Sequence, residues 1–249
     1  MAEFWNLIIL NPMLNVLIAL SALLFNSFGL AIMALTVIVR VVLLPLTLKQ
    51  TKSTKAMQEL QPKIQELQKK HGKNREKMQQ EMGQLYKEAG INPLGCIWPM
   101  LVQLPVWIAL YQSIMRALAT TPENLLSLAF HVYSWPVVVQ SIPVSSQFLW
   151  LNLGENGDLI LAIIVGGTMW VQQKMTTAPS ADPKQKSTSS MMLLMMPVMF
   201  AMFTLMFPSG LALFWVVSNI IGIAVQYKVM GWGYLRIRPA SQPTKVGGK

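Results

Sequence analysis

The sequence is poor in charge and has one cysteine. Asp, Glu, Lys and Arg make up only 12% of its 249 residues, whereas about 25% is usual in soluble domains. Apolar side chains make up 53% of the chain instead. The lone cysteine, Cys96, excludes an internal disulfide and any zinc site built from several cysteines. This composition is typical of a protein that resides in a membrane.

Acidic residues are absent from the interior of the long apolar segments. They lie between these segments or at their edges: Glu3, Glu59, Glu66, Glu76, Glu81, Glu88, Glu123, Glu155, Asp158 and Asp182. Ion-coupled transporters and pumps usually keep a carboxylate within the membrane, so this class of protein is disfavoured. The chain also lacks a phosphate-binding loop, a GxSxG elbow and an HExxH motif. We therefore expect no catalytic site, no metal site and no cofactor.

Basic residues are missing from segment 119–157 and gather in three other segments. Of the 20 Lys and Arg residues, ten lie in 49–87, three in 174–186 and five in 228–249. Basic segments next to membrane spans stay in the cytoplasm. We therefore expect these three segments in the cytoplasm and 119–157 outside it.

This charge distribution predicts an all-α, polytopic membrane protein with five transmembrane helices. Its C-terminus is expected in the cytoplasm and its N-terminus outside. The expected spans are 28–48, 93–118, 159–175, 190–207 and 208–228. They are joined by a cytoplasmic segment 49–92, an outer segment 119–158 and a cytoplasmic loop 176–189, and are followed by a basic tail, 229–249.

Residues 1–27 contain a further apolar stretch that is interrupted by Asn11, Pro12 and Asn15. We expect a helix that lies at the outer membrane surface, with a sixth span as the alternative. A signal peptide is disfavoured because no basic residue precedes Arg40.

The segment 49–92 is predicted to form an antiparallel coiled-coil hairpin. Apolar residues recur at intervals of three and four on both sides of the break "HGKN", and Pro62 is expected to start or kink the first helix. His71, beside Gly72, is expected to be a solvated turn residue. In one interpretation the hairpin is solvated and its basic residues only keep it in the cytoplasm. In the other it docks anionic lipids, ribosomal RNA or a partner protein. The docking residues would be Lys63, Lys69, Lys70, Lys73, Arg75 and Lys77.

Arg40 lies in the middle of the first apolar segment, within "VIVRVVLLPL". A charge at such a depth costs about 2.5–3.5 kcal/mol on insertion scales. Thr36, Thr47 and Thr51 fall on the same helical face as Arg40. The side chain starts toward the helix N-terminus, away from the nearer cytoplasmic exit. Because no intramembrane acid can pair with Arg40, we expect a hydrated cavity around it.

Two other spans carry polar stripes. Cys96, Gln103 and Trp107 share a face of the second span. In the fifth span a face is formed by Trp215, Asn219, Gly222 and Gln226, with Ser218 at its edge. Such stripes face a bundle interior or a water-filled cavity. For Ser218 and Asn219, hydrogen bonding between helices is the alternative interpretation.

Three long motifs resemble the YidC/Oxa/Alb family of membrane protein insertases. They are "GLAIMALTVIVRVVLLPLTLKQTKSTKAMQELQPKIQELQKK", "INPLGCIWPMLVQLPVWIALYQSI" and "FPSGLALFWVVSN". The resemblance covers roughly residues 28–228, with all five spans and the hairpin in order. It implies a location in the inner membrane of a bacterial cell. It also implies five helices around a hydrophilic groove that opens to the cytoplasm and to lipid and is closed on the outside.

The resemblance also implies which residues line this groove. Arg40 matches the family's groove arginine, Thr36 its neighbouring threonine and Gln103 its span-two glutamine. Trp170, in "GGTMWVQQKM", resembles the groove-facing aromatic of span three. Phe214 and Trp215 match the aromatic pair that contacts substrate helices, although relatives often have tyrosine there. We add Ser218 and Asn219 from the polar stripe.

The function implied is that of an insertase, which is not an enzyme and which inserts and helps to fold nascent membrane proteins. Its expected partners are those nascent proteins, anionic lipids, the Sec translocon, signal recognition machinery and the ribosome, but no DNA. A small-solute transporter or channel is the alternative. A transporter would predict inverted repeats and midplane acids, neither of which the sequence contains.

Overall fold

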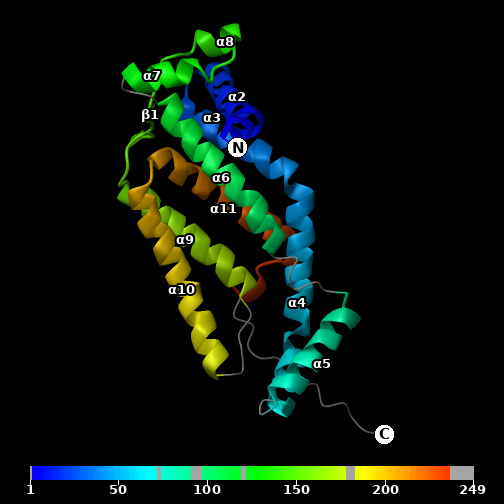
Figure 1. Cartoon of the computed structure of the whole chain (residues 1–249). Helices are drawn as coiled ribbons and strands as arrows, with labels where there is room; N and C mark the ends of the chain where they lie inside the picture. The colour runs from blue at the N-terminus through cyan, green and yellow to red at the C-terminus, as the bar shows by residue number, and fades with distance from the viewer. Residues whose placement is uncertain (1, 72–73, 91–96, 119–121, 178–182, 236–249) are drawn as a thin grey trace.

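The computed structural model describes residues 2–71, 74–90, 97–118, 122–177 and 183–235 of the chain (Figure 1). Most of these residues are helical, as expected, and two short strands pair in the outer segment. In chain order the elements are α1 (Ala2–Trp5), the π-helix η1 (Asn6–Leu10), α2 (Asn11–Leu23), α3 (Phe28–Val42), α4 (Leu44–His71), α5 (Arg75–Glu88), α6 (Ile97–Ala117), α7 (Pro122–Ala129), α8 (Pro136–Val139), β1 (Gln147–Phe148), β2 (Leu151–Asn152), α9 (Leu159–Thr176), α10 (Pro183–Met206), α11 (Ser209–Met230) and the 3₁₀-helix η3 (Gly233–Leu235).

Three described helical segments are long and apolar enough to cross a membrane: Glu3–Leu23, Ser187–Met206 and Ser209–Met230. A fourth is obtained if α3 and the first part of α4 count as one bent span. The helices α6 and α9, at two of the expected spans, do not meet this measure among the described residues. Each carries two glutamines and a basic residue, which lower its mean hydropathy. The count of five spans therefore stays a prediction.

The first expected span is not one straight helix. Helix α3 ends at Val42, α4 begins at Leu44, and the two are bent by 64°. Pro45 follows directly, and it lacks the N–H that would continue the α3 hydrogen-bond ladder. No helix starts at Pro62, since α4 runs through it to His71. The kink that was the alternative at Pro62 stays a prediction.

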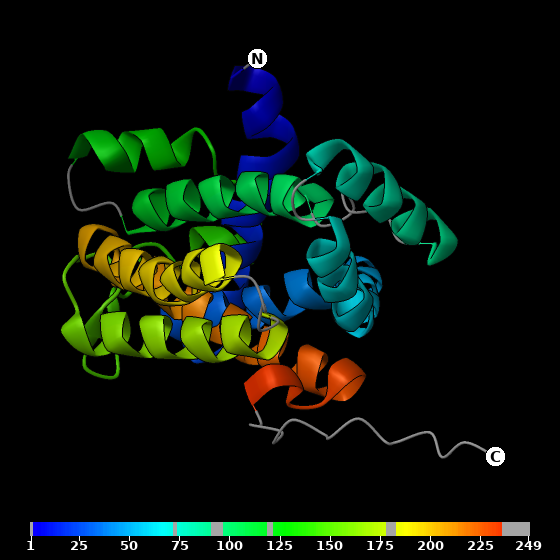
Figure 2. The same ribbon diagram turned by 90° about the horizontal axis from the view of Figure 1, so that it is seen from below.

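The N-terminal helices cross the bundle instead of running along it. Figure 1 looks nearly along α2, whereas Figure 2 shows it lengthwise and crossing α6. The indole Nε1 of Trp5 donates to Gln112 Oε1 of α6 at 2.9 Å. If α6 and its neighbours span the bilayer, a helix in this orientation lies along the membrane surface. The surface helix stays a prediction, and so does the alternative of a sixth span, for which Glu3–Leu23 is long and apolar enough.

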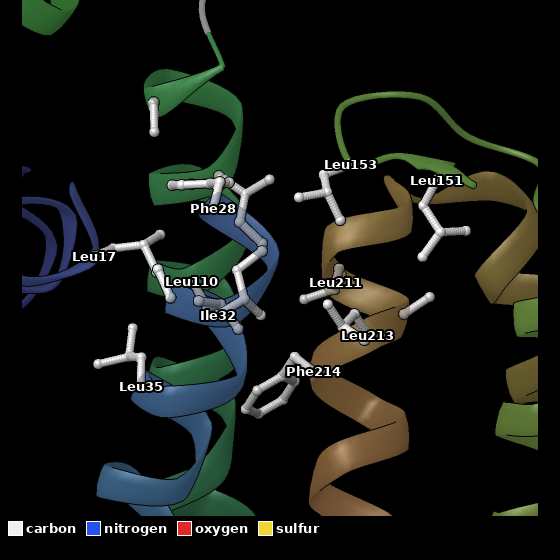
Figure 3. Packing of buried hydrophobic residues seen from close by; sticks show 14 of the residues in the cluster. Leu17, Phe28, Ile32, Leu35, Leu110, Leu151, Leu153, Leu211, Leu213 and Phe214 are labelled. Atoms are coloured by element: carbon white, nitrogen blue, oxygen red, sulfur yellow. The ribbon is translucent and has the colours of Figure 1, made fainter. Parts of the chain in front are cut away.

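An apolar core fills the end of the bundle at which α3 and α11 begin (Figure 3). Phe28 and Ile32 of α3 are fully buried there, as is Leu211 of α11. Gly210 allows a close approach, because a Cβ at this position would lie 3.1 Å from Ile32 Cδ1 and 3.2 Å from the Leu153 carbonyl oxygen. The helices are thus packed closely against one another at this end.

The outer segment is fastened to the same end of the bundle. The backbone N–H and the hydroxyl of Ser209 both donate to the Glu155 carbonyl, at 2.8 and 3.0 Å. Asn15 of α2 is fully buried, and its amide donates to the His131 carbonyl and accepts from Tyr133 N–H. Asn15, which interrupts the apolar stretch in the sequence, thus connects α2 to the outer segment.

The segment after the bend folds back on itself, with α5 lying along the far part of α4 (Figure 1). Ile64 is buried in this hairpin, and Asn74 caps α5 by accepting from Lys77 N–H at 3.2 Å. His71 is not the solvated turn residue that was expected. Its ring is 16% exposed and lies 3.2 Å from a carboxylate oxygen of Glu81, because α5 returns directly over it. The coiled-coil geometry of the hairpin stays a prediction.

Candidate functional site

A polar cavity of about 520 Å³ lies between α3, α4, α6, α9 and α11. Most of its lining side chains are hydroxyls or amides, and Arg40 is the one charged residue among them. The lining residues are Arg40, Leu43, Leu46, Thr47, Gln50, Thr51, Thr54, Gln103, Gln172, Thr176, Gly222, Gln226 and Met230.

Arg40 lies in the last turn of α3, directly before the bend. Among the described residues no carboxylate forms an ion pair with it. An arginine has five N–H donors, and burying them without partners is costly. The guanidinium group can therefore hold water or an acidic group of another molecule, which is the chemistry that the cavity offers.

Threonines of α4 form one wall of the cavity. The hydroxyls of Thr47, Thr51 and Thr54 each donate to the carbonyl four residues earlier, at 3.0, 2.8 and 3.0 Å. Each oxygen keeps an acceptor position free for water. Thr36 behaves differently, because it is 1% exposed, bonds to the Ile32 carbonyl and does not line the cavity.

The opposite wall depends on a close approach of α9 and α11. A Cβ at position 222 would lie 2.3 Å from Nε2 of Gln172, so Gly222 makes room for this glutamine at the cavity. Nearby, Asn219 donates to the Thr168 hydroxyl at 3.1 Å. For Asn219 the structure thus shows the interhelical hydrogen bond that was the alternative interpretation. Its neighbour Ser218 is buried and does not line the cavity either.

The aromatic residues expected in the groove do not line this cavity. Phe214 and Trp215 are only 4% and 8% exposed. Trp215 stacks on Trp107, with 5.9 Å between ring centroids and 26° between planes, and meets Phe200 and Phe207 edge-on. This pair therefore belongs to the packed core, because α6 and α10 cover it. Trp170 is exposed on α9 and does not line the cavity.

The expected docking residues of the hairpin are described only in part. Lys63, Lys70 and Lys77 are exposed. The side chains of Lys69 and Arg75, and all of Lys73, lie outside the described residues, as does Cys96.

Of the residues expected in the groove, the structure brings Arg40 and Gln103 together at the cavity. Gln50, Thr54, Gln172 and Thr176 also line the cavity and were not predicted from the sequence. The first two lie three residues after Thr47 and Thr51, on nearly the same helical face but beyond the expected end of the span, which was a usable signal. The other two lie at the end of α9, where polar residues are ordinary.

Comparisons with known proteins give one consistent result. Residues 20–233 match the family model described as "60Kd inner membrane protein". The membrane protein insertase MisCA of Bacillus subtilis (strain 168) is 34% identical, over 99% of this chain and 86% of its own. The membrane protein insertase YidC 2 of Bacillus anthracis is 36% identical, over 98% and 85%.

A solved structure also resembles the chain. It is described as an active YidC insertase crystal structure with the first transmembrane domain resolved, and its TM-score is 0.57 at 29% sequence identity. The similarity covers 82% of the present chain and 42% of the solved one, so the chain spans less than half of that longer protein.

Proposed function

Because the chain belongs to the 60Kd inner membrane protein family, which includes the YidC insertases, we propose that it inserts nascent membrane proteins into the lipid bilayer and assists their folding. It is not an enzyme. The observation that carries this proposal is the polar cavity around Arg40, with which no carboxylate of the described residues forms an ion pair.

The mechanism is a reduction of the barrier to moving a polar segment across the membrane. The cavity holds water and amide groups partway along the bundle, so a polar flank has a shorter apolar distance to cross. Arg40 attracts acidic residues of that flank, and the attraction is stronger than in bulk water because the surroundings have a lower dielectric constant. The apolar core around Phe28 and Leu211 keeps the other end closed to water.

The apolar part of the substrate then moves into lipid along the helices next to the cavity. Helix α10 exposes methionines along its length, namely Met191, Met192, Met195, Met202 and Met206. Methionine side chains are flexible and adapt to partners of different shape. In this proposal they offer substrate helices a surface that needs no specific sequence.

The surroundings of the protein follow from the same proposal. The cavity opens to the cytoplasm, the N-terminus lies outside and the basic tail lies inside. The hairpin α4–α5 contacts anionic lipid headgroups or a delivering partner through Lys63, Lys70 and Lys77. The Sec translocon, signal recognition machinery and the ribosome are the partners that could deliver substrates.

Reconstitution tests the proposal directly. The full chain in liposomes should insert a small single-span protein so that its outer segment becomes protected from added protease, and empty liposomes should not do so. An Arg40→Ala variant should lose most of this protection, whereas Arg116→Ala, at the far end of α6, should retain it. Insertion that is equal in empty liposomes would refute the insertase role.

A further inference from the structure

The hairpin β1–β2 in the outer segment has an apolar tip. Gln147 pairs with Asn152 and Phe148 with Leu151, which leaves Leu149 and Trp150 as the two residues of the turn. Their side chains are 75% and 57% exposed. Two large apolar residues thus stand out from the protein at the end of a short, hydrogen-bonded ribbon.

These residues are unexpected in a two-residue turn. Leu149 has a φ of 55°, and Trp150 does not have a positive φ. Such a turn favours glycine at its first central position, because a Cβ is strained there. In water a glycine or asparagine would suit both the backbone and the solvent better. An exposed leucine at a strained position therefore indicates that the tip contacts something apolar.

The tip is held at a fixed height by its attachments to the candidate spans. The ring of Phe148 packs directly on Gly29, where a Cβ would lie 2.1 Å from the ring, so β1 lies against the first turn of α3. After the hairpin, the Leu153 carbonyl accepts from Gly210 N–H at the start of α11. The hairpin is thus attached on both sides to the end of the bundle at which α3 and α11 begin. If these helices span the bilayer, their first turns lie at its surface.

A second turn at this end has the same features. Phe25, between α2 and α3, has a φ of 57° and is 92% exposed. It precedes Gly29 by four residues, so it lies near the helix turn that Phe148 covers. Two turns that differ in structure each present an apolar side chain from a strained backbone at the same end of the bundle.

We propose that Leu149 and Trp150, together with Phe25, insert into the outer leaflet at the boundary between headgroups and acyl chains. An exposed tryptophan suits this boundary, because its ring is apolar and its N–H can reach headgroup oxygens. Segment 119–157 has no Lys or Arg, so the contact is hydrophobic and does not depend on anionic lipid. The proposal rests on the membrane location of α3 and α11, not on insertase activity.

Depth-dependent quenching tests this contact in the full chain. In a Cys96→Ser background, single cysteines replace Leu149, Trp150 or Phe25, carry an environment-sensitive fluorophore, and are reconstituted into vesicles of zwitterionic lipid. Bromine on the upper acyl chain should quench these positions several-fold more than position 145 in a Ser145→Cys control, because Ser145 is an exposed polar residue nearby. Quenching no greater than at position 145 would overturn the proposal. That outcome would favour a protein partner at the tip.

A second variant separates lipid contact from folding. Leu149→Gly suits the positive φ, so it should not lower the unfolding temperature in detergent, yet it should reduce quenching of a fluorophore at position 150. A lower unfolding temperature with unchanged quenching would contradict the proposal, since Leu149 would then pack within the protein. Insertion of a single-span substrate is measured in the same vesicles. Lost insertion with retained quenching would refute the proposed function alone.

Discussion

At the scale of single residues, the protein keeps one charge where it is costly and surrounds it with neutral polar groups. Arg40 shares its cavity with Gln103 and Gln172 and with the threonines of α4. Amides and hydroxyls both donate and accept, so they hold water without neutralising the guanidinium charge. An acidic neighbour would pair with the arginine and remove its attraction for a substrate.

We expect substitutions of Arg40 to follow charge and not shape. Arg40→Lys should keep much of the insertion of substrates with acidic outer segments. Arg40→Ala should reduce it about tenfold, which corresponds to roughly 1.4 kcal/mol, and Arg40→Glu should be worst because like charges repel. Protease protection in liposomes measures the effect, and substrates without acidic segments should be affected less. Equal losses for Lys and Ala would show that the guanidinium geometry matters instead.

Gly29 gives a prediction about stability. A Cβ there would overlap the ring of Phe148, so Gly29→Ala should lower the free energy of unfolding by about 1–3 kcal/mol. Gly167→Ala is the matched control, because no atom lies within 4 Å of its added Cβ. In a helix that change should be neutral or stabilising by up to about 1 kcal/mol. Thermal unfolding in detergent compares the two, and equal effects would mean that Phe148 moves aside freely.

At the scale of elements, α4 joins the hairpin to the helices of the cavity. Gln58 Nε2 donates to the carbonyls of Met175 and Thr176 at the end of α9, at 3.2 and 3.0 Å. Lys55 donates to the Val229 carbonyl at the end of α11, at 3.3 Å. These are the terminal carbonyls that lack partners within their own helices and that attract positive charge.

The junction is closed by the residues that follow α11. A Cβ on Gly233 would lie 2.1 Å from the Met175 carbonyl oxygen, and its φ is 51°, so only glycine fits against the end of α9. Partial burial at this contact raises the pKa of the Tyr234 hydroxyl by desolvation. One short region thus fixes α4, α9 and α11 relative to one another, next to the cavity residues Thr176 and Met230.

Removal of the outer part of the hairpin should therefore separate folding from function. Shortening residues 63–88 leaves Lys55 and Gln58 in place, so the membrane core should fold with its usual unfolding temperature. Insertion should fall, because the exposed basic surface is lost. A charge-reversal variant, with Glu at positions 63, 70 and 77, keeps the helices and tests the charge alone. Unimpaired insertion of every substrate tested would make the hairpin a mere linker.

At the scale of the whole molecule, the two ends of the bundle differ. The end at which α3 and α11 begin is packed with apolar side chains and covered by α2 and the outer segment (Figures 1 and 3). The other end contains the polar cavity, next to the basic hairpin. In the proposed mechanism, water and polar peptide enter from this second end only.

The orientation predicted from the basic residues is tested by reporter fusions. Fusions after Lys70, Lys184 and Lys245 should report the cytoplasm, and a fusion near Ser145 should report the outside. All four results follow from the positive-inside rule. A cytoplasmic signal at Ser145 would overturn the five-span topology, whatever the activity of the protein.

Access of water to the cavity is a separate expectation. In a Cys96→Ser background, a cysteine at position 40 or 103 should react with a membrane-impermeant maleimide added from the cytoplasmic side. Thiolates form readily where water reaches them, so the reaction reports hydration as well as side. A cysteine at position 145 is the control and should react from outside. Folded protein in which positions 40 and 103 react from neither side would contradict the cavity mechanism.

The sequence by itself determined the class of the protein, its family and the region of its cavity. Composition indicates a membrane environment directly, because a chain with so few charged residues cannot form the polar surface that a soluble protein needs. Arg40 stands out because the free-energy cost of placing a charged residue within a membrane span is known and large. The spacing of Arg40, Thr47 and Thr51 by seven and four residues is local, so all three residues line the cavity even though the helix bends between Val42 and Leu44. The long motifs identified the family, and the relatives confirm it.

Only the tertiary structure decided which polar and aromatic residues face the cavity. A stripe on a helix shows that several residues point the same way, but not which helix stands opposite them. Trp215 and Asn219 share a face with Gly222, yet α6 and α10 cover the first, α9 binds the second, and the third makes room for Gln172. Likewise, the role of Asn15 depends on its hydrogen bond to the His131 carbonyl, which lies more than a hundred residues away in the sequence. Such contacts depend on how distant parts of the chain pack against one another, and the spacing of residues along a single helix does not predict this packing.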